Sequence, residues 1–122
     1  MPSPQDIEAF AADWYDAWNS HDLDRILSHY RDDVVFTSPL ITEIAGDPSG
    51  RLQGKAALRD YFARGLERFP DLAFEPLLLT AGVDSVVLTY VSVNGRRSCE
   101  AMVLDSDELV QEVRAHYEWA AE

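Results

Sequence analysis

Glu100 is the residue in this sequence whose surroundings best suit acid–base chemistry. It alternates with Met102 and Leu104 along a segment of strand character, so the three side chains share one face. Two apolar companions indicate that this face is buried, and burial raises the pKa of a carboxyl group because it disfavours the charged form. Such a group can act as an acid, a base or a hydrogen-bond donor near neutral pH. The alternatives are an ion pair with Arg97 or Arg114, or a solvent-exposed strand edge.

The histidines do not form a recognisable site. Their spacing does not place ligands on one element, so we expect no metal. His21 and His29 lie near predicted helix ends, where capping or surface roles are expected. His116 falls on the opposite strand face from an apolar set ending at Tyr117, which predicts an interface or surface position. Phosphate-binding glycine loops and serine nucleophile motifs are also absent from the sequence, and we expect no cofactor.

Three amphipathic helices are predicted in the first part of the chain. The first covers about residues 6–19, capped by Ser3 or Asp6. A short second helix begins after Asp22 and carries Leu23, Ile26, Leu27 and Tyr30 on one face. The third covers about residues 55–69. Between the second and third we expect a polar turn at 31–33, a strand at 34–37 and a loop at 40–52 that forms a flap beside a pocket.

The rest of the chain has strand character. Residues 72–80 are interrupted by Pro76, which predicts an edge strand or a bulge. Asn94 and Gly95 join strands at 85–93 and 97–105, since a type I′ hairpin turn needs positive φ at both central positions. A last strand is expected at 108–117.

The strand at 85–93 is apolar on both faces. A strand with one solvated face should alternate apolar and polar residues. We therefore expect the helices to cover one face and a second copy of the chain to cover the other, although a long terminal segment could also do so. The pattern favours a homodimer through the outer sheet face.

Several of these segments resemble, in the same order, the SnoaL-like proteins of the nuclear transport factor 2-like superfamily. The run at 14–24 resembles the junction of their first two helices, where Trp-Asn ends one helix and His-Asp opens the next. Residues 30–36, 54–58, 68–72 and 103–110 are similar to their helix-to-strand junction, third-helix start, following turn and last hairpin. The resemblance spans nearly the whole chain and implies one α+β domain over residues 1–122. Its fold would be a conical α+β barrel with three N-terminal helices on a strongly curved, mainly antiparallel sheet.

This resemblance implies a cone-shaped cavity between the sheet and the helices. The bulky side chains of the sequence suit an apolar ligand site with a few polar groups, although any single one of them is expected to fill the core. The candidate ligand-binding residues are Trp14, Trp18, Tyr30, Phe36, Tyr61, Phe62, Tyr90 and Met102.

The catalytic positions of related enzymes fall on altered residues here. Resemblance to ketosteroid isomerases places their base at Ser38 and their oxyanion tyrosine at Trp14. Serine needs activation to abstract a proton, and an indole can only donate. Their oxyanion acid falls on Glu100. The aspartate of SnoaL-like cyclases falls near Tyr117, a phenol that can orient a carbonyl group but is a poor base.

The composition limits the partners. The formal net charge of −12 argues against nucleic acid and anionic membranes, and it predicts a solubilising surface. One cysteine excludes an internal disulfide framework, and no signal peptide or apolar span is visible, so a cytoplasmic location is expected.

From the resemblance and the surroundings of Glu100, we expect binding of a small, mostly apolar molecule, with isomerisation, cyclisation or dehydration by acid–base chemistry. The alternative is a non-catalytic ligand-binding or dimerisation module.

Overall fold

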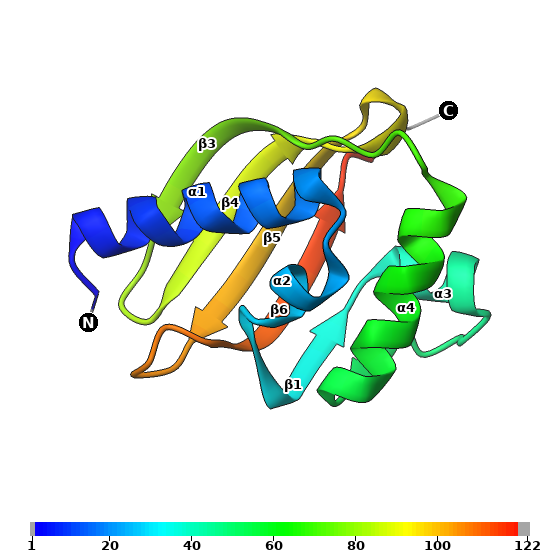
Figure 1. Cartoon of the computed structure of the whole chain (residues 1–122), viewed down its shortest axis with the longest axis horizontal. Helices are drawn as coiled ribbons and strands as arrows, with labels where there is room; N and C mark the ends of the chain where they lie inside the picture. Colours follow the sequence, from blue (N-terminus) through cyan, green and yellow to red (C-terminus); the bar gives the residue numbers. More distant parts are fainter. Residues whose placement is uncertain (1, 120–122) are drawn as a thin grey trace.

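The fold is one curved sheet with all helices on one of its faces (Figure 1). The computed structural model describes residues 2–119 of the 122-residue chain. The helices are α1 (Pro4–Ser20), α2 (Leu23–Leu27), α3 (Pro39–Ala45) and α4 (Lys55–Arg68). The strands are β1 (Tyr30–Thr37), β2 (Arg51–Gln53), β3 (Glu75–Ala81), β4 (Ser85–Val91), β5 (Arg97–Leu104) and β6 (Val110–Tyr117). This is the predicted α+β fold.

The sheet has the strand order β2-β1-β6-β5-β4-β3. Strands β1 and β6 run parallel, and every other pair of neighbours is antiparallel. Strand β3 is therefore an edge strand, and its register shifts between Pro76 and Leu78, as the position of Pro76 predicted. Among residues 2–119, no helix is both long and apolar enough to cross a membrane.

Local side-chain chemistry fixes the ends of the first two helices. The Ser3 hydroxyl accepts a hydrogen bond from the Asp6 amide, and the Asp6 carboxylate accepts one from the Ser3 amide, which makes a capping box. The Asp22 side chain caps α2 by accepting from the Arg25 amide. Both helix starts were predicted from these residue types.

Three predictions for residues 30–52 were wrong. Tyr30 was expected on the second helix, but α2 ends at Leu27 and Tyr30 begins β1. The polar turn at 31–33 belongs to the same strand, which starts opposite Val110 and has a register shift before Val35. This irregularity lets polar side chains enter a strand: Arg31 pairs with Asp33 at 2.9 Å and reaches the Gln111 side chain at 3.3 Å.

The predicted loop at 40–52 contains a fourth helix, α3, and the short strand β2. Ser38 caps α3 by accepting from the Leu40 amide, and Pro39 occupies its first position, where a missing amide proton costs no bond. Ile41 is the residue that α3 buries completely. Gly46 ends the helix with φ at 72°, in the left-handed region.

The β4–β5 hairpin has the predicted turn chemistry. Asn94 and Gly95 have φ values of 58° and 72°, so both central positions adopt the left-handed region that a type I′ turn needs. Strand β4 alternates as expected: Val86, Leu88 and Tyr90 are buried, and Val87 on the outer face is half-buried in the single chain.

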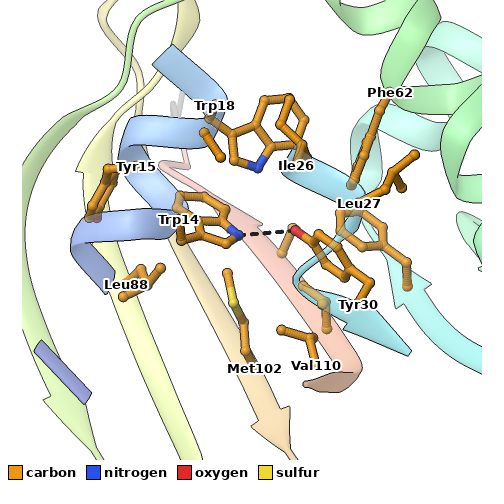
Figure 2. Close-up of a cluster of buried hydrophobic side chains, with 14 of the residues drawn as sticks. Trp14, Tyr15, Trp18, Ile26, Leu27, Tyr30, Phe62, Leu88, Met102 and Val110 are labelled. Atoms are coloured by element: carbon orange, nitrogen blue, oxygen red, sulfur yellow. Dashed lines mark hydrogen bonds between the residues drawn. The ribbon is translucent and has the colours of Figure 1, made fainter. Parts of the chain in front are cut away.

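Aromatic side chains dominate the core between α1 and the sheet (Figure 2). The Trp14 indole donates a 3.1 Å hydrogen bond to the Tyr30 hydroxyl across this core. Trp14 also stacks on Phe74, with ring centroids 5.8 Å apart. Because both polar tips find a partner, Trp14 and Tyr30 can be fully buried without an unpaired group at that bond.

Candidate functional site

A small cavity opens between the C-terminal half of α4, helix α3 and the inner face of the sheet. Its volume is about 60 Å³. Typical small-molecule pockets measure roughly 300–1,000 Å³, so this chamber encloses only a few atoms of a ligand. The lining residues are Trp18, Phe36, Leu40, Ile44, Tyr61, Phe62, Gly65, Phe69, Leu72, Phe74, Tyr90, Ser92, Val93, Glu100 and Tyr117. The wall is thus mostly aromatic and aliphatic.

Glu100 is the acidic residue in this wall. It lies in the middle of β5 with Leu88 and Ala115 as its cross-strand partners, and it is 5% exposed. The Tyr90 hydroxyl donates a 2.7 Å hydrogen bond to Oε1, and Oε2 is buried without a partner. Burial raises the pKa of Glu100 to about 7, against the opposing effect of the Tyr90 bond. The carboxyl can therefore accept or donate a proton near neutral pH.

The two ion pairs considered for Glu100 do not form. Arg97 pairs with Glu118 at 2.8 Å, and Arg114 pairs with Glu112 at 3.2 Å. Both arginines are exposed, whereas Glu100 shares the buried face with Met102 and Leu104, as predicted.

Among residues 2–119, only one other buried side-chain polar atom is unpaired, and it belongs to a residue that also lines the cavity. The Trp18 Nε1 is buried without a hydrogen-bond partner. It faces the Tyr30 hydroxyl and acts to lower the pKa of that phenol against the larger effect of burial, but it does not meet hydrogen-bond geometry (Figure 2). An unpaired buried indole N–H is costly, but this one faces Tyr30 in the adjoining core and not the cavity.

All five tyrosines of the chain are influenced by Glu100. Burial raises the pKa of each phenol, and the negative charge of the Glu100 carboxylate raises it further. For Tyr61 the result is a pKa of about 12. These phenols stay protonated near neutral pH and cannot act as bases, and those of Tyr61 and Tyr117, which line the cavity, can donate hydrogen bonds to a ligand.

Ser38 lies beside the cavity but is not part of its lining. Its hydroxyl caps α3 and acts to lower the pKa values of Tyr61 and Tyr117 against the larger effect of burial. Ser38 is 4% exposed, and its neighbours give it no base that could activate it. Ser38 is therefore placed to orient the phenols of Tyr61 and Tyr117.

Apart from Ser38, the predicted site residues fall into two groups in the structure. Seven of them line the cavity: Trp18, Phe36, Tyr61, Phe62, Tyr90, Glu100 and Tyr117. Trp14, Tyr30 and Met102 are instead fully buried in the adjoining core (Figure 2). These three residues fill the core, which the sequence analysis expected of any single bulky side chain.

The sequence did not reveal part of the wall. Leu40 and Ile44 lie on the unpredicted helix α3, and Leu72 and Phe74 lie in the connection between α4 and β3. Ile41 and Ile44 are three residues apart and Leu40 and Ile44 four, which is the spacing of one helix face. The two glycines and the proline at 46–50 favoured a loop instead.

The segment that carries Leu72 and Phe74 is held by residues at the end of α1. The Asn19 side chain donates to the Phe74 carbonyl oxygen at 3.1 Å and accepts from the Phe74 amide at 2.7 Å. The His21 Nε2 lies 2.7 Å from the Leu72 carbonyl oxygen. His21 also ends α1 with φ at 61°, so its predicted capping role is confirmed.

His29 and His116 lie away from the cavity wall. His29 caps the last carbonyls of α2, with Nδ1 3.2 Å from the Arg25 carbonyl oxygen, but it is buried rather than on the surface. Its Nε2 lies 2.7 Å from the Asp13 carboxylate. His116 is exposed, as expected. Within the described residues, no three His, Cys, Asp or Glu side chains are arranged to hold a metal ion.

Comparisons with known proteins agree with this architecture. A SnoaL-like protein of unknown function from Burkholderia thailandensis is 43% identical, covering 98% of this chain and 100% of that one, with a TM-score of 0.91. An NTF2-like protein of unknown function from Cytophaga hutchinsonii is 12% identical, covering 97% and 95%, with a TM-score of 0.71. The epoxide hydrolase/cyclase-like enzyme SalBIII, associated with pyran ring formation in salinomycin, is 20% identical, covering 97% and 95%, with a TM-score of 0.73.

The two more distant likenesses show the fold alone. A search of curated proteins finds no match. The family model for the SnoaL-like domain matches residues 11–121, which is nearly the whole chain. The chain therefore belongs to the SnoaL-like family.

Proposed function

We propose that this protein binds a small, mostly apolar, uncharged molecule in the cavity and acts on it by acid–base catalysis through Glu100. One observation carries the proposal: a carboxyl group buried in an apolar wall keeps Oε2 unpaired. A buried unpaired carboxyl oxygen lowers the stability of the fold, and a ligand that pairs with it would offset that cost.

The arrangement of the two oxygens suits proton transfer. Tyr90 donates to Oε1, so in the neutral acid the proton resides on Oε2, where it can be donated to a ligand oxygen. In the ionised form, Oε2 can remove a proton from the ligand. Because the pKa of Glu100 is about 7, both forms are populated near neutral pH.

The wall favours a ligand without charge. Among the described residues that line the cavity, none is Lys, Arg or His, so an anionic ligand finds no counter-ion. Tyr61 and Tyr117 would orient a ligand carbonyl or hydroxyl group as donors, whereas the Tyr90 proton is already donated to Oε1 of Glu100. These features suit isomerisation, cyclisation or dehydration at a carbon next to a carbonyl group. The likeness to the cyclase-like SalBIII, associated with pyran ring formation, supports cyclisation among these.

The proposal is tested by exchange of α-hydrogens of small ketones in D₂O, followed by NMR. We expect the protein to accelerate exchange, with a rate that rises as Glu100 ionises through about pH 7. Glu100→Gln should remove this acceleration, since an amide cannot take the proton. Glu67→Gln, the same change at an exposed position of α4, is the matched control. Equal exchange with Glu100→Gln and the unsubstituted protein would show that Glu100 is not the base.

The alternative is a ligand-binding module without catalysis. It is favoured by the absence of a second acid from the described cavity wall, since Ser38 and Tyr117 occupy the positions where related enzymes carry acids. A module would bind small ketones without accelerating exchange, so the same experiment separates the two functions.

We also propose a homodimer through the outer face of the sheet. Val87, Val91, Ala101 and Val103 form a half-buried apolar patch there, flanked by the exposed Arg114. The helices cover the inner face, so a second copy is the simplest cover for this patch. The cytoplasmic location inferred from the sequence stays a prediction.

A further inference from the structure

One position in the cavity wall carries no side chain. Along the inner face of α4, Tyr61 and Phe62 line the cavity, and Phe69 lines it just after the helix ends. Gly65 lies four residues after Tyr61 and four before Phe69, so it belongs to the same face. A regular helix face with bulky residues therefore has one gap, at Gly65.

The gap opens into free space. A Cβ atom built on Gly65 would meet no atom within 4 Å outside its own helix and neighbours. The φ of Gly65 does not lie in the left-handed region, unlike those of Gly46, Gly50, Gly54 and Gly95, so the backbone there does not require glycine. Glycine is also among the poorest helix formers, so its presence in the middle of α4 lowers the stability of this helix.

The cavity is too small to enclose a whole ligand, so the gap at Gly65 matters for ligand binding. A volume of about 60 Å³ encloses only a few atoms, so a larger ligand must extend beyond it. Around Glu100, the walls are aromatic rings packed against one another, such as Trp18 against Phe62 at 4.7 Å and Phe74 against Tyr90 at 4.4 Å. Gly65 is one of the partly exposed residues of the wall, and it is the one without a side chain.

We propose that Gly65 is a specificity-determining residue: the polar end of the ligand pairs with Glu100, and its apolar tail passes over Gly65. The size of the residue at position 65 then sets the length of ligand that the protein accepts. This inference rests on the proposed function, since it assumes that the cavity binds a ligand with a polar end.

The test uses two methyl ketones of different length, 2-butanone and 2-nonanone. Their binding to the ¹⁵N-labelled protein is followed by NMR through the indole N–H signal of Trp18, which lines the cavity. We expect 2-nonanone to bind the unsubstituted protein more tightly than 2-butanone. In Gly65→Leu, the affinity for 2-nonanone should fall by about ten-fold or more because the new side chain occupies the gap, while that for 2-butanone changes little.

Two further variants distinguish a blocked ligand path at position 65 from general damage to the fold. Gly65→Ala should raise the Tm by roughly 2–5 °C, because the helix gains propensity and the added methyl group meets open space. Ala63→Leu, which puts the same side chain on the exposed face of α4, should leave both affinities unchanged.

Each other outcome overturns the inference. Equal loss of both ketones in Gly65→Leu, unchanged binding of 2-nonanone, or a lower Tm in Gly65→Ala would each show that Gly65 does not open the wall. Those results leave the proposed function intact if 2-butanone still binds the unsubstituted protein. Absence of saturable binding of both ketones to the unsubstituted protein would overturn the proposed binding function, and with it this inference.

Discussion

Tyr90 and Glu100 are diagonal neighbours on the inner face of β4 and β5, where the tyrosine hydroxyl donates a 2.7 Å hydrogen bond to Oε1 of the carboxyl group. Both side chains are buried, so this bond forms in a surrounding of low polarity. The bond stabilises the ionised carboxylate, whereas burial stabilises the neutral acid, and burial has the larger effect on the pKa of Glu100. The relationship makes the protonation of Glu100 depend directly on Tyr90.

Removal of this bond should make Glu100 a weaker acid. In Tyr90→Phe, the ionised carboxylate loses its donor, so the pKa of Glu100 should rise above its value of about 7. A hydrogen bond to a charged group is worth roughly 1.5–3 kcal/mol, which corresponds to a proton affinity about ten-fold higher or more. The ¹³C signal of the Glu100 carboxyl, followed against pH, measures the change. Tyr15→Phe, which removes a buried phenol that bonds to the Thr89 carbonyl instead, should leave that titration nearly unchanged.

Glu100 should also make the folded state less stable at higher pH. Its pKa is about 7 in the folded protein and 4.5 in the unfolded chain, so between these values the folded state binds more protons. The free energy of unfolding should therefore fall as the pH rises from 4.5 through 7, by about 3 kcal/mol in total, and level off above that range. The lowered pKa values of Asp13 and Glu118 act at lower pH, where their protonation removes stability.

Urea unfolding at several pH values checks this dependence. Glu100→Gln should remove the fall between pH 4.5 and 7, because the amide does not titrate. Above pH 7 the variant should be at least as stable as the unsubstituted protein. The same slope in both proteins would mean that Glu100 does not titrate in this window.

The fold could be predicted from the sequence where one signal decided each element. The capping residues Ser3 and Asp22 and the Asn94-Gly95 turn each fixed a boundary by local chemistry, and the alternation around Glu100 placed its side chain on the buried face. The exact cavity wall could not be predicted in this way. Trp14 and Trp18 lie on the same helix stripe, yet one fills the core and the other lines the cavity. That difference depends on the packing of Phe62 and Phe74 from distant segments.

Asn19 should contribute to stability through the segment that it holds. Asn19→Ala removes two hydrogen bonds to the Phe74 backbone and leaves a partly buried amide and carbonyl without these partners. We expect a loss of about 2 kcal/mol in the free energy of unfolding and faster hydrogen exchange of the Phe74 amide. Asn19→Asp, which keeps the acceptor for the Phe74 amide but loses the donor, should have the smaller effect on exchange. Unchanged protection of the Phe74 amide in Asn19→Ala would contradict this role.

The outer face of the sheet can be tested through Val87. It pairs across the strands with Ala101 and lies near the middle of the half-buried apolar patch. If two copies pack through this patch, Val87→Lys places a charge from each copy inside the interface, where it has no partner and costs several kcal/mol. Sedimentation velocity should then show a dimer for the unsubstituted protein and a monomer for the variant. Val83→Lys makes the same change at an exposed residue outside the strands and should leave the dimer intact, so dissociation by both substitutions would point to a general effect of charge. A monomer in the unsubstituted protein would refute the dimer, and the apolar outer face of β4 would then be exposed to water.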